Sequence, residues 1–259
     1  MMISVITAVR NAAETIADTL TSVASQTYPQ VEHIVIDGNS NDNTMEVVDR
    51  FGPNVPKVIS EPDSGIYEAM NKGIQHAEGE IIGTLNADDI YAHDHVLETV
   101  AKVFASQRVE SCYADLVYVD RQDLSRIVRY WKSRPFKPGL FARGWIPAHP
   151  TFFVRRSVYR RYGGFDLQYA LQSDFELAMR FLEVHRISAT YIPEIFVKMR
   201  LGGATNKSIK NIVKGNLESY RACRFHGLQI YAVPFFVNKF LSRLPQFLRR
   251  PHGSDVDVI

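Results

Sequence analysis

The sequence predicts an α/β fold, a Rossmann-like mixed sheet flanked by helices, with a helical extension at its C-terminal end. Short β-branched runs alternate with helical apolar patterns through residues 1–100, two strand-like runs flank a polar turn near residue 120, and only helical patterns follow Asn206. Strands separated by helices form a parallel, helix-covered sheet, whereas a hairpin adds antiparallel strands. We therefore expect a sheet that begins parallel and becomes mixed.

The first part of the chain follows β-α-β order. Its apolar, β-branched runs predict strands at residues 3–9, 33–36, 57–60 and 80–85. An apolar stripe at helical spacing predicts the first helix, and its members are Ile16, Leu20, Val23 and Ala24. Asn43 and Glu46, at capping-box spacing, are expected to open the second helix, and a third is expected over residues 67–77.

Beyond residue 110 the pattern changes. Residues 113–119 and 127–131 predict a hairpin around a turn at 120–125, and a loop-rich segment, a helix at 173–185 and an extended run at 189–199 follow. After Asn206 an amphipathic helical pattern continues to about Leu248, with interruptions expected at Pro234 and Pro245. We therefore expect an α/β domain over residues 1–205 and a basic, amphipathic helical extension over residues 206–259.

The composition is that of one large globular domain, or of one domain with an appendage. The chain has 259 residues, of which 46% are hydrophobic and 22% charged. No apolar run reaches the ~18 residues needed to cross a bilayer, and the first residues lack the features of a signal peptide. Cys112 and Cys223 provide neither a disulfide framework nor a zinc site. We expect a cytoplasmic protein, with attachment to the inner face of the cell membrane as an alternative.

The near-neutral charge of the chain conceals an asymmetry. Residues 1–100 hold 4 lysines and arginines against 16 acidic residues, whereas residues 196–252 hold 11 against the single Glu218. Acidic and basic ends are expected to meet different partners, because carboxylates suit metals while cations suit phosphates, lipid or nucleic acid.

Polar side chains follow the predicted strands at the edge where α/β sheets bind ligands. Asn11 follows the first strand, Asp37 the second, and Asp88 and Asp89 come directly after the strand that ends at Leu85. Helix caps and turns are common roles for single residues of these types. Two adjacent carboxylates, however, repel each other unless solvent or a cation compensates their charge.

Neither a dinucleotide fingerprint nor a P-loop is present, so a diphosphate at this edge would have to be held mainly by a metal ion. A nucleotide pocket of this kind suits a base contacted by Asp37, a ribose held by Asp88 and a cation on Asp89.

Four segments, in their order and spacing, resemble the family 2 glycosyltransferases, which have the GT-A fold. They are SVITAVRN at 4–11, VIDGNSNDNT at 35–44, SEPDSGIYEAMNKG at 60–73 and LNADD at 85–89. The resemblance covers roughly residues 3–200 and leaves the final helical region outside.

The resemblance implies an inverting, metal-dependent enzyme that moves a sugar from a nucleotide-diphosphate donor to an acceptor hydroxyl in surface polysaccharide or glycoconjugate synthesis. A UDP-sugar is the favoured donor and a GDP-sugar the alternative. The resemblance assigns Asp89 to a divalent cation, Mn²⁺ or Mg²⁺, and Asn86 stands where many members have another aspartate. The donor-binding residues it implies are Thr7, Ala8, Arg10, Asn11, Asp37, Asn39, Asp63, Gly65, Lys72, Asn86, Asp88, His149 and Arg200.

The base that deprotonates the acceptor is implied to be Asp174, which follows a Gly163-Gly164 pair as in the family. Asp166 and Glu176 are weaker alternatives. A purely structural role for Asp174 is a carboxylate at a helix N-terminus with Ser173 as the cap. The segment HPTFF at 149–153, which begins with His149, resembles a family segment that borders the acceptor or donor-sugar site.

The basic region from Lys207 to Arg250 interleaves cations with aromatic residues. We weigh two functions for it: a peripheral membrane contact that brings a glycan or lipid-linked sugar acceptor to the site, and simple packing on the domain. Nucleic acid is not an expected partner, because no recognised module accompanies the charges.

Two other functions remain as alternatives. A sugar-nucleotide nucleotidyltransferase would need a glycine-rich, basic phosphate loop that residues 8–11 do not supply. A non-catalytic nucleotide-sugar binding protein would have no need of a base such as Asp174.

Overall fold

The computed structural model describes residues 1–52, 55, 57–202, 208–241 and 246. Within these residues one nine-stranded sheet forms the centre of the molecule, in the order β3-β2-β1-β4-β8-β6-β9-β5, with β7 paired to β6. Its strands are β1 (Ile3–Val9), β2 (Val31–Asp37), β3 (Lys57–Ser60), β4 (Ile81–Thr84), β5 (Ile90–Tyr91), β6 (Ser111–Val119), β7 (Ile127–Trp131), β8 (Phe153–Arg155) and β9 (Ala189–Arg200).

The sheet is mixed, as predicted. Strands β3, β2, β1 and β4 are parallel, β8 is antiparallel to both β4 and β6, and β6 and β7 form the predicted antiparallel hairpin. Strand β9 returns parallel to β6 and carries β5 on its other edge. The parallel strands therefore end together at one edge, where the polar segments follow them.

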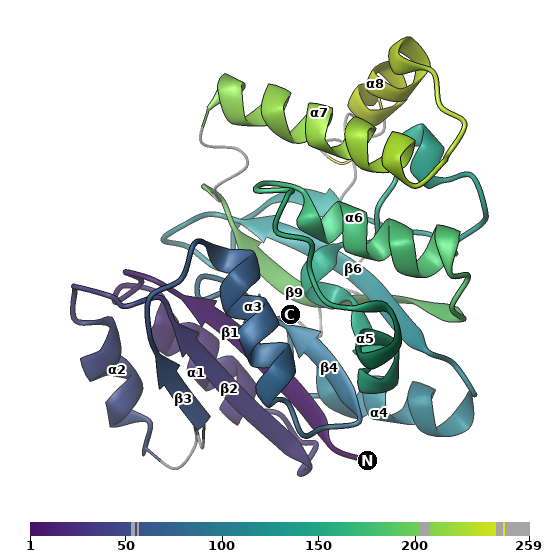
Figure 1. Cartoon of the computed structure of the whole chain (residues 1–259). Helices are drawn as coiled ribbons and strands as arrows, with labels where there is room; N and C mark the ends of the chain where they lie inside the picture. The colour runs from purple at the N-terminus through teal and green to yellow at the C-terminus, as the bar shows by residue number, and fades with distance from the viewer. Residues whose placement is uncertain (53–54, 56, 203–207, 242–245, 247–259) are drawn as a thin grey trace.

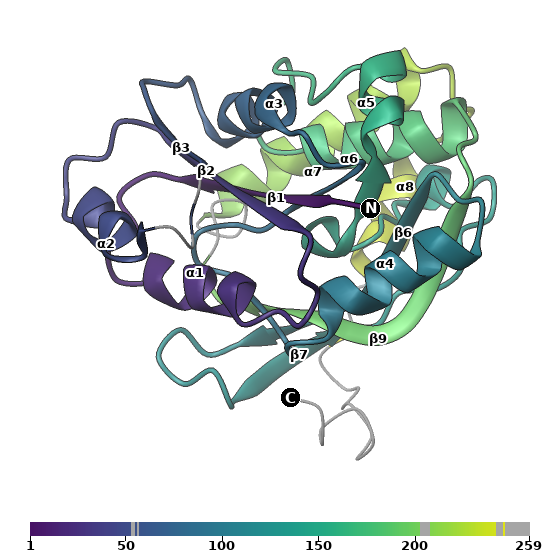
Figure 2. The ribbon, with the colours of Figure 1, turned by 90° about the horizontal axis from the view of Figure 1, so that it is seen from below.

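Helices cover both faces of this sheet (Figure 1). They are α1 (Ile16–Ala24), α2 (Thr44–Arg50), α3 (Ile66–His76), α4 (Val96–Ser106), α5 (Arg156–Tyr162), α6 (Ser173–Met179), α7 (Ile209–Phe225) and α8 (Ala232–Leu241). Figure 2 shows α3, α5 and α6 on one face and α1, α2 and α4 on the other, and α7 and α8 lie beyond α6. No helix in the described ranges is long and apolar enough to span a membrane.

Strand β1 has a buried residue at every position because it lies between two helix layers. Its side chains alternate: Ile6 and Ala8 pack in the cluster that includes α3, whereas Ile3 and Val5 pack in the cluster that includes α4. A Cβ at Gly73 would lie 2.3 Å from Ile6 Cγ2, so α3 can approach β1 this closely only with glycine there.

Two local predictions were wrong. Asn43 stands at the cap position of α2 but its side chain makes no capping hydrogen bond, so the expected capping box does not form. Pro234 does not interrupt a helix but lies in the first turn of α8, where its missing N–H is tolerated; the break comes earlier, after α7. Pro245 and Leu248 lie outside the described residues, as do Lys207, Arg250 and part of the expected 206–259 extension.

Candidate active site

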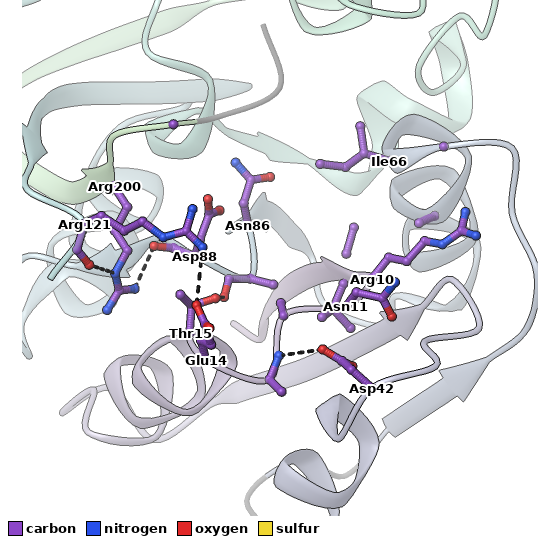
Figure 3. Close-up of a pocket in the computed structure, with 18 of the residues that line it drawn as sticks. Arg10, Asn11, Glu14, Thr15, Asp42, Ile66, Asn86, Asp88, Arg121 and Arg200 are labelled. Carbon is purple, nitrogen blue, oxygen red and sulfur yellow. Dashed lines mark hydrogen bonds and ion pairs between the residues drawn. The ribbon is translucent and has the colours of Figure 1, made fainter. Parts of the chain in front are cut away.

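A cavity of about 660 Å³ opens at the edge where β1 and β4 end (Figure 3). It is lined by the chain after β1, the start of α3, the turn after β4 and the end of β9. Pockets for small ligands typically measure ~300–1,000 Å³, so a molecule of the size of a nucleotide sugar matches this cavity.

The cavity gathers eight of the residues singled out from the sequence: Ala8, Arg10, Asn11, Asp63, Gly65, Asn86, Asp88 and Arg200. The others do not line it in the described residues: Thr7, Asp37, Asn39, Lys72, Asp89, His149 and Asp174. Arg121 and Glu14 also line it, and their side chains lie 3.5 Å apart. No sequence motif pointed to these two residues, and Arg121, in the turn between β6 and β7, is brought to the cavity only by the fold.

The loops after β1 and β2 are tied together beside the cavity. The Asn11 backbone N–H donates to Ser40 Oγ at 2.9 Å, and the Asn11 side-chain oxygen accepts from the Asn41 backbone at 2.9 Å. Asn11 and Asn39 adopt left-handed backbone conformations, with φ of 52° and 59°, which asparagine tolerates better than most residues. These contacts hold Asn11 at the cavity wall.

Asp37 is fully buried at the end of β2 and accepts hydrogen bonds from the Ser40 backbone, the Ser40 hydroxyl and the Ser60 hydroxyl. Next to it, a Cβ at Gly38 would lie 2.4 Å from Asp63 Oδ2. The absence of a side chain at Gly38 therefore lets Asp63, which lines the cavity, pack against the end of β2.

The turn after β4 holds two buried oxygen atoms without a hydrogen-bond partner among the described residues, Asn86 Oδ1 and Asp89 Oδ1. Asn86 Nδ2 donates to the other Asp89 oxygen at 2.9 Å, and burial together with the charge of Asp88 raises the pKa of Asp89. Buried unpaired oxygens are costly, and carboxylate and carbonyl oxygens are what hard cations bind. The donor set therefore suits a divalent cation, although no three His, Cys, Asp or Glu side chains converge within the described ranges.

Arg200 ties four segments together at the cavity wall. Its guanidinium donates to the Asp88 carbonyl oxygen at 2.8 Å and to the Arg121 carbonyl oxygen at 3.3 Å, and it pairs with the Asp18 carboxylate of α1. Only 5% of Arg200 is exposed. In this structure its contacts fix the Asp88 turn and the hairpin tip rather than reaching into open solvent.

Asp174 belongs to a cluster built on α3 and α6, and α3 begins at the cavity residue Ile66. Tyr67, which follows the cavity residue Ile66, donates its hydroxyl to Asp174 Oδ1 at 3.0 Å. Burial, followed by the charge of Asp174, raises the pKa of Tyr67, so the hydroxyl remains a donor at neutral pH. Sequence reasoning missed Tyr67 as a partner, although it stands within the third family-like segment.

His149 joins the same cluster. Its ring packs edge-on against Phe165 at 5.6 Å, and its Nε2 lies 3.1 Å from Thr84 Oγ1 at the end of β4. Phe165 in turn stacks on Tyr67 at 5.4 Å. Burial lowers the pKa of His149, while Asp174 opposes that shift. His149 and Asp174 are therefore brought into one neighbourhood.

The remaining predicted residues make protein contacts away from the cavity lining. Thr7 is buried, with its hydroxyl 3.0 Å from His33 Nε2. Lys72 pairs with Glu61 at 3.0 Å and with Glu68 at 3.4 Å. Of the alternative bases, Glu176 is buried between Arg180 and His226, at 2.8 Å and 2.7 Å, and Asp166 accepts from the Gln168 backbone. The helix that carries Asp174 begins at Ser173 with Gln172 at the cap position, so Ser173 is not the cap.

The comparisons with known proteins agree on one family. The model of glycosyl transferase family 2 matches residues 4–163. A PGL/p-HBAD biosynthesis glycosyltransferase of Mycobacterium tuberculosis is 29% identical over 209 residues, which is 79% of each chain. An uncharacterized glycosyltransferase of the same organism is 31% identical over 180 residues, covering 69% of this chain and 68% of that one.

Solved structures show the same fold. Residues 1–349 of Staphylococcus aureus TarS with UDP-GlcNAc superpose with a TM-score of 0.65 at 15% identity, covering 94% of this chain and 72% of that one. The mannosyltransferase PcManGT from Pyrobaculum calidifontis, in complex with GDP-Man and Mn²⁺, gives 0.61 at 20% identity, covering 94% and 70%. The sheet flanked by helices is thus a GT-A fold.

Proposed function

Because this chain belongs to glycosyl transferase family 2, we propose that it transfers a sugar from a nucleotide-diphosphate donor to an acceptor hydroxyl, with inversion at the anomeric carbon. One observation carries the proposal: the cavity collects Asn11, Asp63 and Asp88 from three separate loops, and Tyr67, which follows the cavity residue Ile66 in α3, donates a hydrogen bond to Asp174. A UDP-sugar is the favoured donor and a GDP-sugar the alternative, and fold neighbours hold UDP-GlcNAc and GDP-Man.

Within this proposal the donor lies in the cavity with its ribose on Asp88 and its base toward the ends of β1 and β2, the strands that carry the buried Thr7 and Asp37. Asp89 and Asn86 would hold a divalent cation, Mn²⁺ or Mg²⁺, through the oxygens that lack other described partners. The cation would neutralise the charge that leaves with the nucleotide diphosphate. Arg121 and Arg10 add positive charge at the cavity lining, and both suit the donor phosphates.

Asp174 is the proposed base. Its Oδ1 accepts the hydrogen bond from the Tyr67 hydroxyl, and this contact orients the carboxylate. The other carboxylate oxygen, Oδ2, takes the proton of the acceptor hydroxyl while the acceptor oxygen attacks the sugar. The bond to the diphosphate breaks on the opposite face, so displacement inverts the anomeric carbon and needs no covalent sugar–enzyme intermediate. The proton ends on Asp174 and the negative charge on the departing diphosphate.

A glycan or a lipid-linked sugar is the proposed acceptor, in the synthesis of a surface polysaccharide or glycoconjugate at the inner face of the membrane. Phe225 at the end of α7 is 74% exposed and Tyr231 before α8 is 80% exposed. Further exposed apolar side chains on these helices are Val213, Leu217, Val233, Val237, Phe240 and Leu241, and exposed cations are Lys210, Lys214, Arg221 and Arg224. Apolar side chains among cations are typical of surfaces that lie on anionic membranes.

The transfer proposal is tested by thermal shift of the full chain with UDP- and GDP-sugars, each with Mn²⁺ and with EDTA. A ligand that binds only the folded state raises the melting temperature, so one donor with Mn²⁺ is expected to do so. Product formed with that donor is then examined by NMR for inverted anomeric configuration. No shift with any nucleotide sugar, or synthesis of a nucleotide sugar from a sugar phosphate and a nucleoside triphosphate, would contradict transferase function.

The membrane contact is tested by flotation with anionic and neutral vesicles at low salt. The parent chain is expected to float with anionic vesicles, and Phe225→Ser with Tyr231→Ser to remain behind. Val58→Ser, a matched change at an exposed apolar residue of β3, is expected to float like the parent. A parent chain that stays in the soluble fraction would rule the contact out.

A further inference from the structure

The chain just before Asp174 is held by hydrogen bonds with α7 and α8. The backbone N–H groups of Leu171 and Gln172 both donate to Glu218 Oε2 of α7, at 2.8 Å and 3.1 Å. Glu218 is 6% exposed, so this carboxylate is withdrawn from water and directed at the segment that opens α6. Gln172 stands two residues before Asp174, at the cap position of that helix.

A second line of contacts reaches Gln172 from α8. Lys239 is 5% exposed and donates to Ser219 Oγ at 2.6 Å, and the Ser219 hydroxyl lies 2.8 Å from Gln172 Oε1. Lys239 also lies 4.9 Å from the ring centre of Phe175, the residue after Asp174. Burying an ammonium group is costly, and here its hydrogen bond to Ser219 and its approach to the Phe175 ring link it to the start of α6, while the ring of Phe235 in α8 lies 5.8 Å from it.

The packing leaves little freedom at this junction. A Cβ at Gly215 of α7 would lie 3.3 Å from Gln172 Nε2, and a Cβ at Gly144 would lie 2.7 Å from Lys239 Cβ. Glycine at these two positions lets α7 approach Gln172 and lets α8 approach the 3₁₀ turn Phe141–Arg143. Figure 1 shows α7 above α6 in the view, with α8 beside α7, on the side away from the sheet.

We propose that Glu218, Ser219 and Lys239 are positioning residues that set the place of Asp174 relative to the bound donor, so that α7 and α8 complete the active site without lining the donor cavity. The inference rests on the proposed role of Asp174 as the base. Glu218 also lies close enough to Tyr67 for its charge to contribute, after burial and Asp174, to the raised pKa of that hydroxyl. These three residues lie beyond residue 163, where the family match ends.

The test compares kcat with the donor KM in the full chain for Glu218→Ala and Lys239→Met. Misplacing a catalytic group by about 1 Å can cost about a hundredfold in rate, so a loss of kcat of at least about tenfold is expected, with the donor KM within about twofold of the parent. Glu218→Gln keeps an oxygen toward the two N–H groups and is expected to recover most of the rate. Glu183→Ala is the matched control, because Glu183 also accepts a backbone N–H, that of Gly139, but lies at the far end of the same helical run.

Repeating each change in the Asp174→Asn background distinguishes a residue that positions Asp174 from one with a merely structural role. If Glu218 acts through Asp174, Glu218→Ala lowers the residual rate no further there. Parental kcat in Glu218→Ala, or an equal loss in both backgrounds, would overturn the inference. Should the larger changes prevent folding, Ser219→Ala removes a single oxygen and is expected to lower kcat at least about threefold, with a parental rate again overturning it. Failure of this inference can be told apart from failure of the base assignment, because in the second case Asp174→Asn itself would keep the parental rate.

Discussion

Replacing Asp174 with asparagine changes the proposed base while keeping the shape of the side chain. The amide retains an oxygen that can accept the Tyr67 hydroxyl hydrogen bond, which is 3.0 Å long in the structure. A neutral acceptor gives a hydrogen bond weaker by about 1 kcal/mol than a charged one, so the melting temperature is expected to fall by only about 2–4 °C. Because so small a destabilisation leaves the protein folded at the assay temperature, a loss of activity must then come from the chemical step rather than from unfolding.

The expected loss of rate follows from the proposed role. A positioned base contributes about 10² to 10⁴ in rate, which corresponds to about 2.7–5.5 kcal/mol of activation free energy. Donor binding should be unchanged, because Asp174 does not line the cavity and its described hydrogen bond goes to Tyr67. The change should therefore appear in kcat, with the donor dissociation constant within about twofold of the parent.

The assay follows release of the nucleotide diphosphate at saturating donor, with donor affinity measured separately by calorimetry. Tyr67→Phe is the matched control, since it leaves the carboxylate in place and removes only the hydroxyl that orients it. We expect a loss of about tenfold for Tyr67→Phe, smaller than for Asp174→Asn. An asparagine variant that transfers sugar at near-parental rate would refute the assignment of Asp174 as the base.

Three further predictions concern the cavity and the sheet beneath it. Asp89→Ala should weaken donor binding at least about tenfold in Mn²⁺ and leave it unchanged in EDTA, and equal Mn²⁺-dependent affinity in calorimetry would contradict the cation assignment. Gly38→Ala should displace Asp63, because the new Cβ would lie 2.4 Å from its Oδ2, and raise the donor KM about three- to tenfold in initial-rate measurements; an unchanged KM would show that Asp63 has no part in binding. Burial lowers the pKa of His33 from 6.5 to about 4, so the unfolded chain takes up this proton first as the pH falls. The free energy of unfolding should therefore decrease between about pH 6.5 and pH 4, by about 3 kcal/mol from this residue, and urea unfolding of His33→Gln should lack that part of the slope.

The parallel half of the sheet could be predicted because each strand carries its own signal. β1 and β3 lie at the residues expected. The continuous β-branched run of β1 is typical of a strand buried on both faces, whereas β3 is a partly exposed strand at the edge of the sheet. Strands β5 and β8 were not predicted. They have two and three residues, too few for periodicity to appear, and they exist through pairing with β9 and with β4 and β6. Helix α4 was also missed, although its apolar stripe was present in the sequence.

One part of the site could likewise be predicted from the sequence, and another part could not. The strand-end argument placed Asn11 and Asp88 at one edge of the sheet, because parallel strands end there together, and the family resemblance added Asp63; all three line the cavity. The contacts of Arg200 could not be predicted, since its partners come from α1, the turn after β4 and the tip of the hairpin. The roles assigned to Asp37, Asp89, Asp174 and the other singled-out residues stay predictions for the experiments above, as does the division of the chain at residue 205.

The attachment of Gln172 to α7 and α8 bears on how relatives of this protein can diverge. In the proposed function the donor binds among loops of the parallel strands, whereas the segment that precedes the proposed base, Asp174, is anchored by α7 and α8. Exchange between relatives of the loops that follow the parallel strands can then change which nucleotide sugar is bound, while the position of Asp174 stays the same. Conversely, a chimera in which α7 and α8 are replaced by those of a relative should differ in turnover and acceptor choice. Its donor preference should remain that of the present chain.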